Sequence, residues 1–198
     1  MTSLSPLSTP NPLPGPFRAR DAEAQGISRV TLRRLVAKGE LLSIGRGLYM
    51  RPEAPVTAHH SLALVAARVP AGVVNLLSAL AFHQLTDELP GAVWLAIAQG
   101  SQAPRLDGQR LELTWTAPRF LTLGVERHVI EGVEVAITDP VRTVVDCFRF
   151  RTRVGLDVAL AALRGLLAQR RDGRDVVWRM AGLCRVQTVI RPYLESLS

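Results

Sequence analysis

The sequence predicts an α+β protein: a small N-terminal domain, then a larger α/β domain with a small, mostly antiparallel sheet and a helical C-terminal part. Hydrophobic residues make up 47% of the 198 positions and charged residues 21%, a balance typical of a chain that buries a core. Apolar residues recur with the helical period in some segments and alternate with polar residues in others. The Ser- and Pro-rich residues 1–16 are expected to be a flexible tail, because proline fixes φ and removes a backbone donor.

The first folded segment, residues 17–54, contains two predicted helices joined by a tight turn. The first helix covers residues 18–25. The second begins after Ser28, because the serine hydroxyl can accept a hydrogen bond from a free backbone N–H of the first turn. One face of this second helix is an apolar stripe that must turn toward a core, formed by Leu32, Leu35 and Val36.

A hairpin follows over residues 41–50, where two short apolar strands flank the tip Gly45-Arg46-Gly47. Helix, turn, helix and hairpin in this order predict a winged helix-turn-helix domain. In such a domain the second helix enters the DNA major groove, and the hairpin reaches the backbone or the minor groove.

The charge distribution favours a polyanionic partner for this segment. The net charge is +7, and Lys38 is the only lysine among 24 basic residues, so the others are arginines. Residues 1–52 carry eight basic and three acidic groups, residues 53–147 six and ten, and residues 148–198 ten and four. A basic terminal module is typical of nucleic-acid binding, and a cationic surface that only confers solubility is the competing interpretation.

The candidate DNA-binding residues follow from the geometry of the second helix. Arg29 and Arg33 are i, i+4 neighbours outside the apolar stripe, so both guanidiniums can enter one groove and bind guanine. The N–H groups beside Ser28 can bind a phosphate, and the glycines around Arg46 let the wing approach DNA closely. For Arg34 and Lys38, a solvated helix face is the open alternative. The full set is Ser28, Arg29, Thr31, Arg33, Arg34, Lys38 and Arg46.

Residues 55–198 predict a second domain that combines a sheet with helices. A helix begins after Asp139, which is a suitable N-cap, with Pro140 at its first position. The last segment, 175–197, is expected to form two short helices divided near Pro192. The other elements are helices over 58–69 and 76–85, strands over 93–97, 111–116, 125–130 and 133–137, and a longer helix with Leu156, Leu160, Leu163 and Leu167 on one face.

Several classes of function are disfavoured by the sequence. No apolar run reaches the roughly 18 residues that a membrane helix needs, and the first 17 residues lack the features of a secretory signal. Cys147 and Cys184 are expected to be buried reduced thiols, so the chain is expected to be cytoplasmic. The four histidines lack the spacing of a metal site, no Walker-type phosphate loop occurs, and no nucleophile–base spacing stands out, so we expect no metal site, no cofactor and no enzymatic activity.

Short blocks along the chain resemble the AbiEi family of antitoxins, in the order in which that family carries them, over about residues 17–197. The N-terminal blocks are Gly26-Ile27-Ser28-Arg29, Leu32-Arg33-Arg34-Leu35, Gly39-Glu40-Leu41 and Gly45-Arg46-Gly47-Leu48-Tyr49. Those of the second domain include Asn75-Leu76-Leu77-Ser78-Ala79-Leu80, Val93-Trp94-Leu95-Ala96, Thr138-Asp139-Pro140-Val141-Arg142-Thr143 and Arg191-Pro192-Tyr193-Leu194-Glu195.

This resemblance implies a function and two partners. It implies an antitoxin of a bacterial type IV toxin–antitoxin system linked to phage defence. The winged helix would bind inverted repeats of double-stranded DNA in the operon's own promoter and act as a transcriptional repressor. The second domain would counteract a nucleotidyltransferase-like toxin, by direct binding or indirectly. Family members also carry a helix before the one at 18–25, where this chain has its proline-rich stretch.

Two questions stay open at the level of sequence. A stand-alone transcriptional repressor, whose second domain senses a signal or dimerises, would share the same winged helix. The arginines of the C-terminal part could form a solvated face, a second DNA contact or the surface that counters the toxin. They are Arg149, Arg151, Arg153, Arg170, Arg171 and Arg174.

Overall fold

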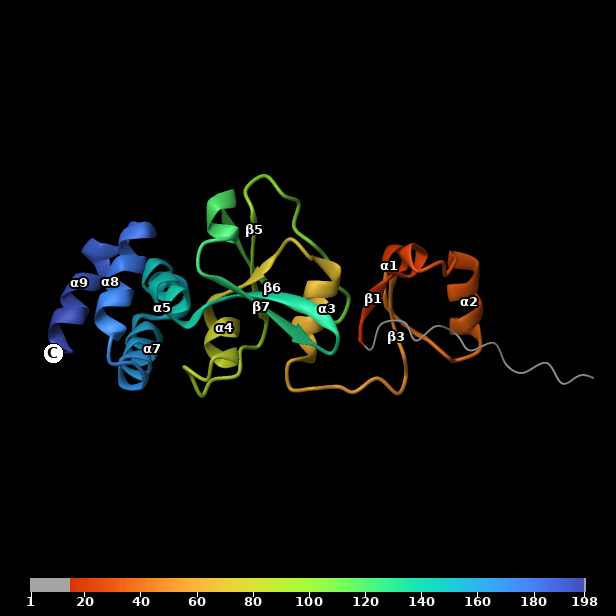
Figure 1. The fold of residues 1–198 in the computed structure, drawn as a ribbon, viewed down its shortest axis with the longest axis horizontal. Coiled ribbons are helices and arrows are strands. Elements are labelled where there is room, and N and C mark those ends of the chain that lie inside the picture. The colour runs from red at the N-terminus through yellow and green to blue at the C-terminus, as the bar shows by residue number, and fades with distance from the viewer. Residues whose placement is uncertain (1–14, 198) are drawn as a thin grey trace, which may run out of the picture.

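A computed structural model describes residues 15–197 and arranges them as three parts in a row (Figure 1). The small N-terminal domain lies at one end, a sheet with helices in the middle, and a group of helices at the other end. The tail expected over residues 1–16 lies outside the described residues except for Gly15 and Pro16, and both of these are buried.

The N-terminal domain contains a helix, a turn, a second helix and a hairpin in that order, which confirms the predicted winged helix-turn-helix. A strand that the sequence did not predict, β1, joins the hairpin as a third, antiparallel strand in the order β1-β3-β2. It covers two residues, which is too short for an alternation of side chains to be recognised. The elements are β1 (Phe17–Arg18), α1 (Ala19–Ala24), α2 (Arg29–Ala37), β2 (Leu42–Gly45) and β3 (Leu48–Met50).

The start and end of α2 follow from its sequence. The Ser28 hydroxyl accepts a hydrogen bond from the backbone N–H of Thr31 at 3.1 Å, as an N-cap should. Ile27, just before the cap, and Leu32, in the second turn, are buried in the same cluster and form a hydrophobic staple. The helix ends before Gly39, whose φ of +74° is a left-handed conformation that glycine adopts without strain.

The sheet of the second domain is mixed, which corrects the expectation of a mostly antiparallel sheet. Its strand order is β6-β5-β4-β8-β7; β4 pairs with β8, and β5 with β6, in parallel, whereas β4–β5 and β7–β8 are antiparallel. Alternation along a strand reveals which face is buried but not which strand lies beside it, so the sequence could not supply the pairing. The strands are β4 (Val73–Val74), β5 (Val93–Ala98), β6 (Leu111–Thr116), β7 (Val125–Ile130) and β8 (Val133–Thr138).

Helices cover the sheet and form the C-terminal part. The chain breaks before α9 at Arg185, with φ of +58°, and Pro192 lies inside α9, so the division expected near Pro192 is wrong. The helices are α3 (His60–Arg68), α4 (Leu76–Phe82), α5 (Pro140–Arg149), α6 (Arg151–Val154), α7 (Leu156–Gln169), α8 (Gly173–Leu183) and α9 (Gln187–Ser196), with a short 3-10 helix, η1, at Pro118–Leu121.

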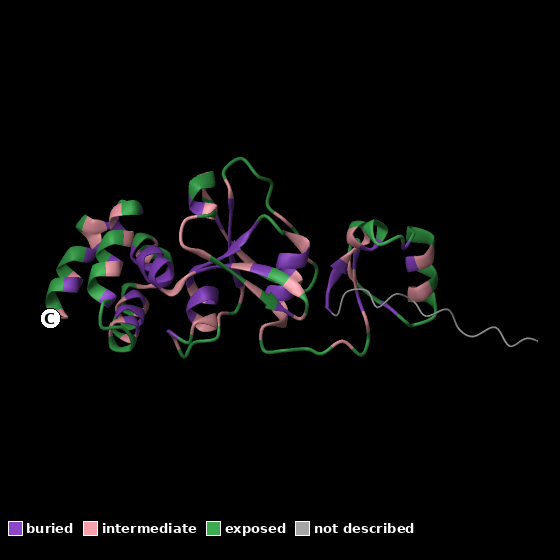
Figure 2. Ribbon diagram, viewed as in Figure 1, coloured by how far each residue is buried: buried purple, intermediate pink, exposed green. Residues whose placement is uncertain are grey.

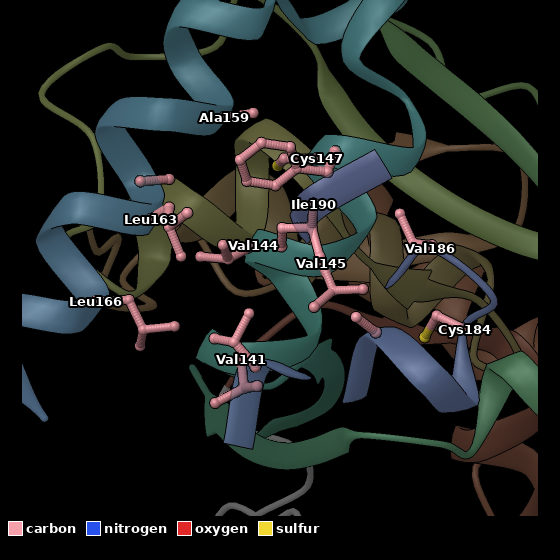
Figure 3. Close-up of a cluster of buried hydrophobic side chains, with 14 of the residues drawn as sticks. Val141, Val144, Val145, Cys147, Ala159, Leu163, Leu166, Cys184, Val186 and Ile190 are labelled. Carbon is pink, nitrogen blue, oxygen red and sulfur yellow. The ribbon is translucent and has the colours of Figure 1, made fainter. Parts of the chain in front are cut away.

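Three clusters of buried apolar side chains hold these parts. The largest joins α4, α5, α7, α8 and α9, and Figure 3 shows Leu163 of α7 pointing toward Val144 of α5. A second cluster packs α3 against the sheet. The smallest lies in the winged helix, consists of Phe17, Ala22, Ile27, Leu32 and Leu41, and borders a cavity of about 340 Å³. In Figure 2 the buried residues accordingly concentrate in the middle and C-terminal parts.

Candidate nucleic-acid interface

The recognition-helix candidate α2 turns its arginines outward. Leu32 is 1% exposed, and Leu35 and Val36 pack against the same cluster, so the predicted stripe faces the core. The opposite face is exposed and carries Arg29, Val30, Arg33, Arg34 and Ala37. This orientation follows from the 3.6-residue period, which separates the two faces of one helix.

A groove of about 410 Å³ gathers arginines from separate elements. Arg29 and Arg33 reach it from α2, and Arg46 reaches it from the tip of the β2–β3 wing. The structure therefore brings three of the predicted residues to one place, although 13 positions of the chain separate Arg33 from Arg46. The groove is lined by Ala19, Arg29, Arg33, Arg46, Gly47, Tyr49 and Arg68.

The groove is strongly positive because most of its guanidiniums have no acidic neighbour. Arg33 and Arg46 make no hydrogen bond or ion pair with any residue that the structure describes. Arg29 Nε lies 2.7 Å from Glu23 Oε1 of α1. Both partners of this pair are exposed, and such pairs contribute only about 0–1 kcal/mol, so an incoming phosphate or base can displace Glu23.

The amino end of α2 provides hydrogen-bond donors beside this groove. Ser28 and Thr31 hydroxyl oxygens lie 3.0 Å apart, and Ser28 also caps the helix, so both side chains are held in place. The first N–H groups of a helix point out of its end and carry partial positive charge. Together they form an arrangement that accepts a phosphate.

Arg34 and Lys38 stand apart from the groove. Both are exposed, but neither lines it, and Lys38 Nζ lies 3.9 Å from Glu40 Oε1. The structure thus divides the predicted set into three arginines that line the groove, Ser28 and Thr31 at the amino end of α2, and two residues outside the groove.

Two residues that the sequence did not single out belong to this surface. Val30 is 74% exposed at the start of α2, where an apolar side chain can contact a thymine methyl group. Arg68 lines the groove from the last position of α3, in the second domain. No sequence pattern marks Arg68, because its position depends on how the two domains pack.

The four histidines lie close together in the second domain, although the sequence did not indicate that they would meet. His59, His83 and His128 surround the ring of Phe82 with centroid distances of 5.0, 5.2 and 4.8 Å. His60 Nδ1 lies 2.7 Å from Glu131 Oε2. Within residues 15–197, no three His, Cys, Asp or Glu side chains are placed to hold a metal ion. The other contacts are His128 Nε2 with Glu126 Oε2 at 3.1 Å and His83 Nε2 with the Thr138 carbonyl at 2.8 Å, so we assign this cluster to the structure of the domain.

None of the described helices is long and apolar enough to cross a membrane. The two cysteines, Cys147 and Cys184, are buried and unbridged, as expected. Burial raises the pKa of Cys184, and it raises the pKa of Cys147 as well, so both thiols stay protonated at neutral pH.

Comparisons with known proteins agree with the N-terminal geometry. Residues 13–52 match a family model, AbiEi_4, described as "Transcriptional regulator, AbiEi antitoxin", which confirms the resemblance over that segment. A crystal structure of the RV2827C protein from Mycobacterium tuberculosis has a similar fold, with a TM-score of 0.55 and 14% sequence identity. The alignment covers 85% of this chain but 66% of the mycobacterial chain, so this chain spans less than two thirds of it. No curated protein sequence matches this chain significantly.

Proposed function

We propose that this chain, whose N-terminal segment matches the AbiEi transcriptional regulators, binds double-stranded DNA in its own promoter and represses its operon. The observation that supports this most strongly is the convergence of Arg29, Arg33 and Arg46 on one groove between helix α2 and the wing. A winged helix presents these two elements to DNA. Guanidiniums are the side chains best suited to phosphates and guanine edges.

In this proposal α2 lies in the major groove. Arg29 and Arg33 read base edges, and Ser28, Thr31 and the adjacent N–H groups hold a phosphate at the amino end of the helix. Arg46 contacts the backbone or the minor groove from the wing. Arg34 and Lys38 flank these contacts and add a weaker attraction to neighbouring phosphates.

The deciding experiment measures binding of the full chain to a duplex of its own promoter and to single-base-pair variants of that duplex. Arg33→Ala should weaken binding by about 1–3 kcal/mol at one base-pair position, because a bidentate guanine contact contributes that much discrimination. Arg34→Ala is the matched control, since it removes the same charge from the same helix outside the groove. Equal weakening on every sequence would make Arg33 a phosphate contact, and no binding by the wild type would refute the proposal.

We further propose that the second domain counteracts a nucleotidyltransferase-like toxin, which is the antitoxin role that the AbiEi resemblance implies. The test is co-expression of the full chain with the product of the adjacent gene, measured as rescue of growth. Deleting residues 1–52 should abolish repression while rescue persists. If rescue disappears although the remaining domain stays folded, the division of roles between the domains is wrong.

A stand-alone repressor is the competing function, since the family match is confined to residues 13–52. Under that alternative no toxin gene lies beside this one, and the second domain acts by sensing or dimerisation. The identity of the neighbouring reading frame therefore distinguishes the two functions before any protein is made.

A further inference from the structure

The arginine groove is not built by the winged helix alone. Arg68, which ends α3 of the second domain, lines it together with Arg29, Arg33 and Arg46. The hydrogen bond from Arg68 Nε to the Arg105 carbonyl is long, at 3.4 Å, and the structure records no acidic partner for Arg68 within residues 15–197. A duplex seated in this groove would therefore contact both domains.

Arg18 holds the end of α3 where Arg68 lies. Its Nε donates to the carbonyl oxygen of Ala67, and its Nη2 donates to that of Arg68 at 2.7 Å. These are carbonyls at the carboxyl end of a helix, which lack partners inside the helix. Two bonds from one planar guanidinium restrict both the distance and the direction of the helix end.

The backbone of Arg18 belongs to the wing. Arg18 in β1 pairs with Leu48 of β3, and the next backbone N–H, that of Ala19, donates to the Gly47 carbonyl at 3.0 Å. Gly47 and Ala19 also line the groove. One residue thus joins the strand beside Arg46 to the helix that carries Arg68, and in Figure 1 β1 lies on the side of the N-terminal domain that faces α3.

A second set of contacts fixes the other end of α3. Glu131, in the turn between β7 and β8, accepts hydrogen bonds from the Thr57 backbone N–H at 2.7 Å and from the Thr57 hydroxyl at 3.0 Å. It also pairs with His60, the first residue of α3. Gly15 packs so closely on the Glu131 carbonyl that a Cβ at this position would lie 1.8 Å from that oxygen. The Glu131 bonds therefore fix the amino end of α3 within the second domain, and Gly15 is the residue by which the N-terminal segment meets that end.

The positive charges at this seam repel one another unless an anion is present. Burial lowers the pKa of the Arg18 guanidinium, and the charges of Arg20 and Arg68 lower it further, against the opposing effect of Asp21. Guanidiniums stay charged in proteins, so the repulsion persists in the unbound molecule. A phosphate between Arg68 and the wing would relieve it.

We propose that Arg18 is a positioning residue for DNA binding, which keeps Arg68 of the second domain in the groove so that both domains bind one duplex as a unit. This inference rests on the proposed DNA-binding function. Arg18 itself does not line the groove; it acts through α3, and Arg68 supplies the phosphate contact.

The test measures binding of the full chain to a duplex of its own promoter at several salt concentrations. Arg68→Ala should reduce the slope of log K against log salt by about 0.9, the value for one phosphate contact. Arg18→Met should reduce it by the same amount, although Arg18 lies outside the groove. The double variant should bind no more weakly than Arg68→Ala, because both changes remove one contact. Arg110→Ala, an exposed arginine of the second domain outside the groove, should change neither the affinity nor the slope.

Each outcome has a defined meaning. Additive losses from Arg18→Met and Arg68→Ala, or an unchanged slope for Arg68→Ala, would overturn the inference. If circular dichroism shows that Arg18→Met does not fold, Arg18→Lys takes its place. Lysine keeps the charge but cannot make both hydrogen bonds to the end of α3, so this variant should give the same salt slope as Arg68→Ala.

Arg33→Ala distinguishes a failure of this inference from a failure of the proposed DNA-binding function. If it loses binding while the Arg18 and Arg68 variants equal wild type, only this inference fails; if the wild type binds no DNA, the proposed function fails.

Discussion

Two parts of this molecule are rich in arginine and use it in opposite ways. In the winged helix, Arg33 and Arg46 contact no carboxylate or carbonyl of the described residues and converge on a groove. In the C-terminal helical part, residues 140–197, most guanidiniums bind the protein itself. Examples are Arg142 with Asp146, Arg151 with the Phe148 carbonyl, Arg153 with Glu112 and Arg174 with the Leu194 carbonyl.

The difference teaches that net charge does not locate a binding surface. Residues 1–52 and 148–198 have similar excesses of basic residues, yet only the first set gathers its unpaired guanidiniums in one place. The guanidiniums of Arg164, Arg171 and Arg185 make no hydrogen bond or ion pair with the described residues either, but these three arginines lie on α7, after α7 and after α8, away from the arginine groove. A field strong enough to hold a polyanion needs charges that converge.

The largest effect is expected where an arginine holds the fold. Arg142 is 3% exposed, its Nε lies 2.9 Å from Asp146 Oδ2, and its Nη1 donates to the Leu123 carbonyl. Arg142→Ala should lower the free energy of unfolding by about 3–5 kcal/mol, because it leaves the Asp146 carboxylate buried and unpaired. Urea denaturation measures the change.

The matched control removes both partners of this pair. Arg142→Met with Asp146→Leu should recover a large part of the loss, because no unpaired charge then remains in the core. Asp146 already has one oxygen without a hydrogen-bond partner in the structure, and burial raises its pKa, so the carboxylate depends on Arg142. A single variant as stable as the wild type would show that this arginine is not structural.

An arginine of the groove should show the reverse pattern. Arg46→Ala is expected to weaken DNA binding about tenfold on all sequences, and to reduce the salt slope by about 0.9, because it removes a phosphate contact. Its free energy of unfolding should change by less than about 0.5 kcal/mol, since Arg46 is exposed. Arg164→Ala, an exposed arginine of α7, is the control and should leave DNA binding unchanged. Equal effects of the two variants would erase the contrast between the regions.

Acid should loosen the amino end of α3 without loosening the C-terminal core. Burial raises the pKa of Glu131, but hydrogen bonds from Thr57 and His60 outweigh it, so the pKa lies below its ordinary value. A lowered carboxyl pKa means that the stabilisation is complete above the unfolded value of about 4.3 and is lost as the pH falls through the folded value.

Hydrogen exchange of the backbone N–H of Thr57 tests this sign. Between pH 5 and pH 3 its protection, corrected for the intrinsic rate, should fall in the wild type. In Glu131→Gln the protection should be lower at pH 5 and should not change further, because no carboxylate remains to titrate. Amides of α7 should keep their protection over this range. Unchanged protection in the wild type would show that the Glu131 carboxylate does not hold the amino end of α3.

The smallest effect concerns the ion pair that Arg29 of the groove makes with Glu23. Glu23→Gln releases Arg29, and it should strengthen DNA binding by no more than about fivefold, because an exposed pair contributes about 0–1 kcal/mol. Glu40→Gln removes the same charge beside Lys38, away from the groove, and serves as the control. If both variants strengthen binding equally, the gain comes from net charge and not from the release of Arg29.

Local features of the N-terminal domain were determined by the sequence alone. The Ser28 cap, the apolar stripe of α2 and the glycine-flanked wing depend on neighbours within a few residues, and all three are present in the structure. These features also settle which way Arg29 and Arg33 point, because a helix that buries one face must expose the other.

Only the tertiary structure decided which distant residues meet. Three features join segments far apart in the chain: the mixed strand pairing of the second sheet, the position of Arg68 in the groove, and the hydrogen bonds from Arg18 to the end of α3. Such contacts depend on the packing of whole elements against one another, and neither the period nor the charge of a short segment carries information about its partner. The sequence therefore predicted the outward-facing arginines of α2, whereas the shared groove depends on how the two domains pack.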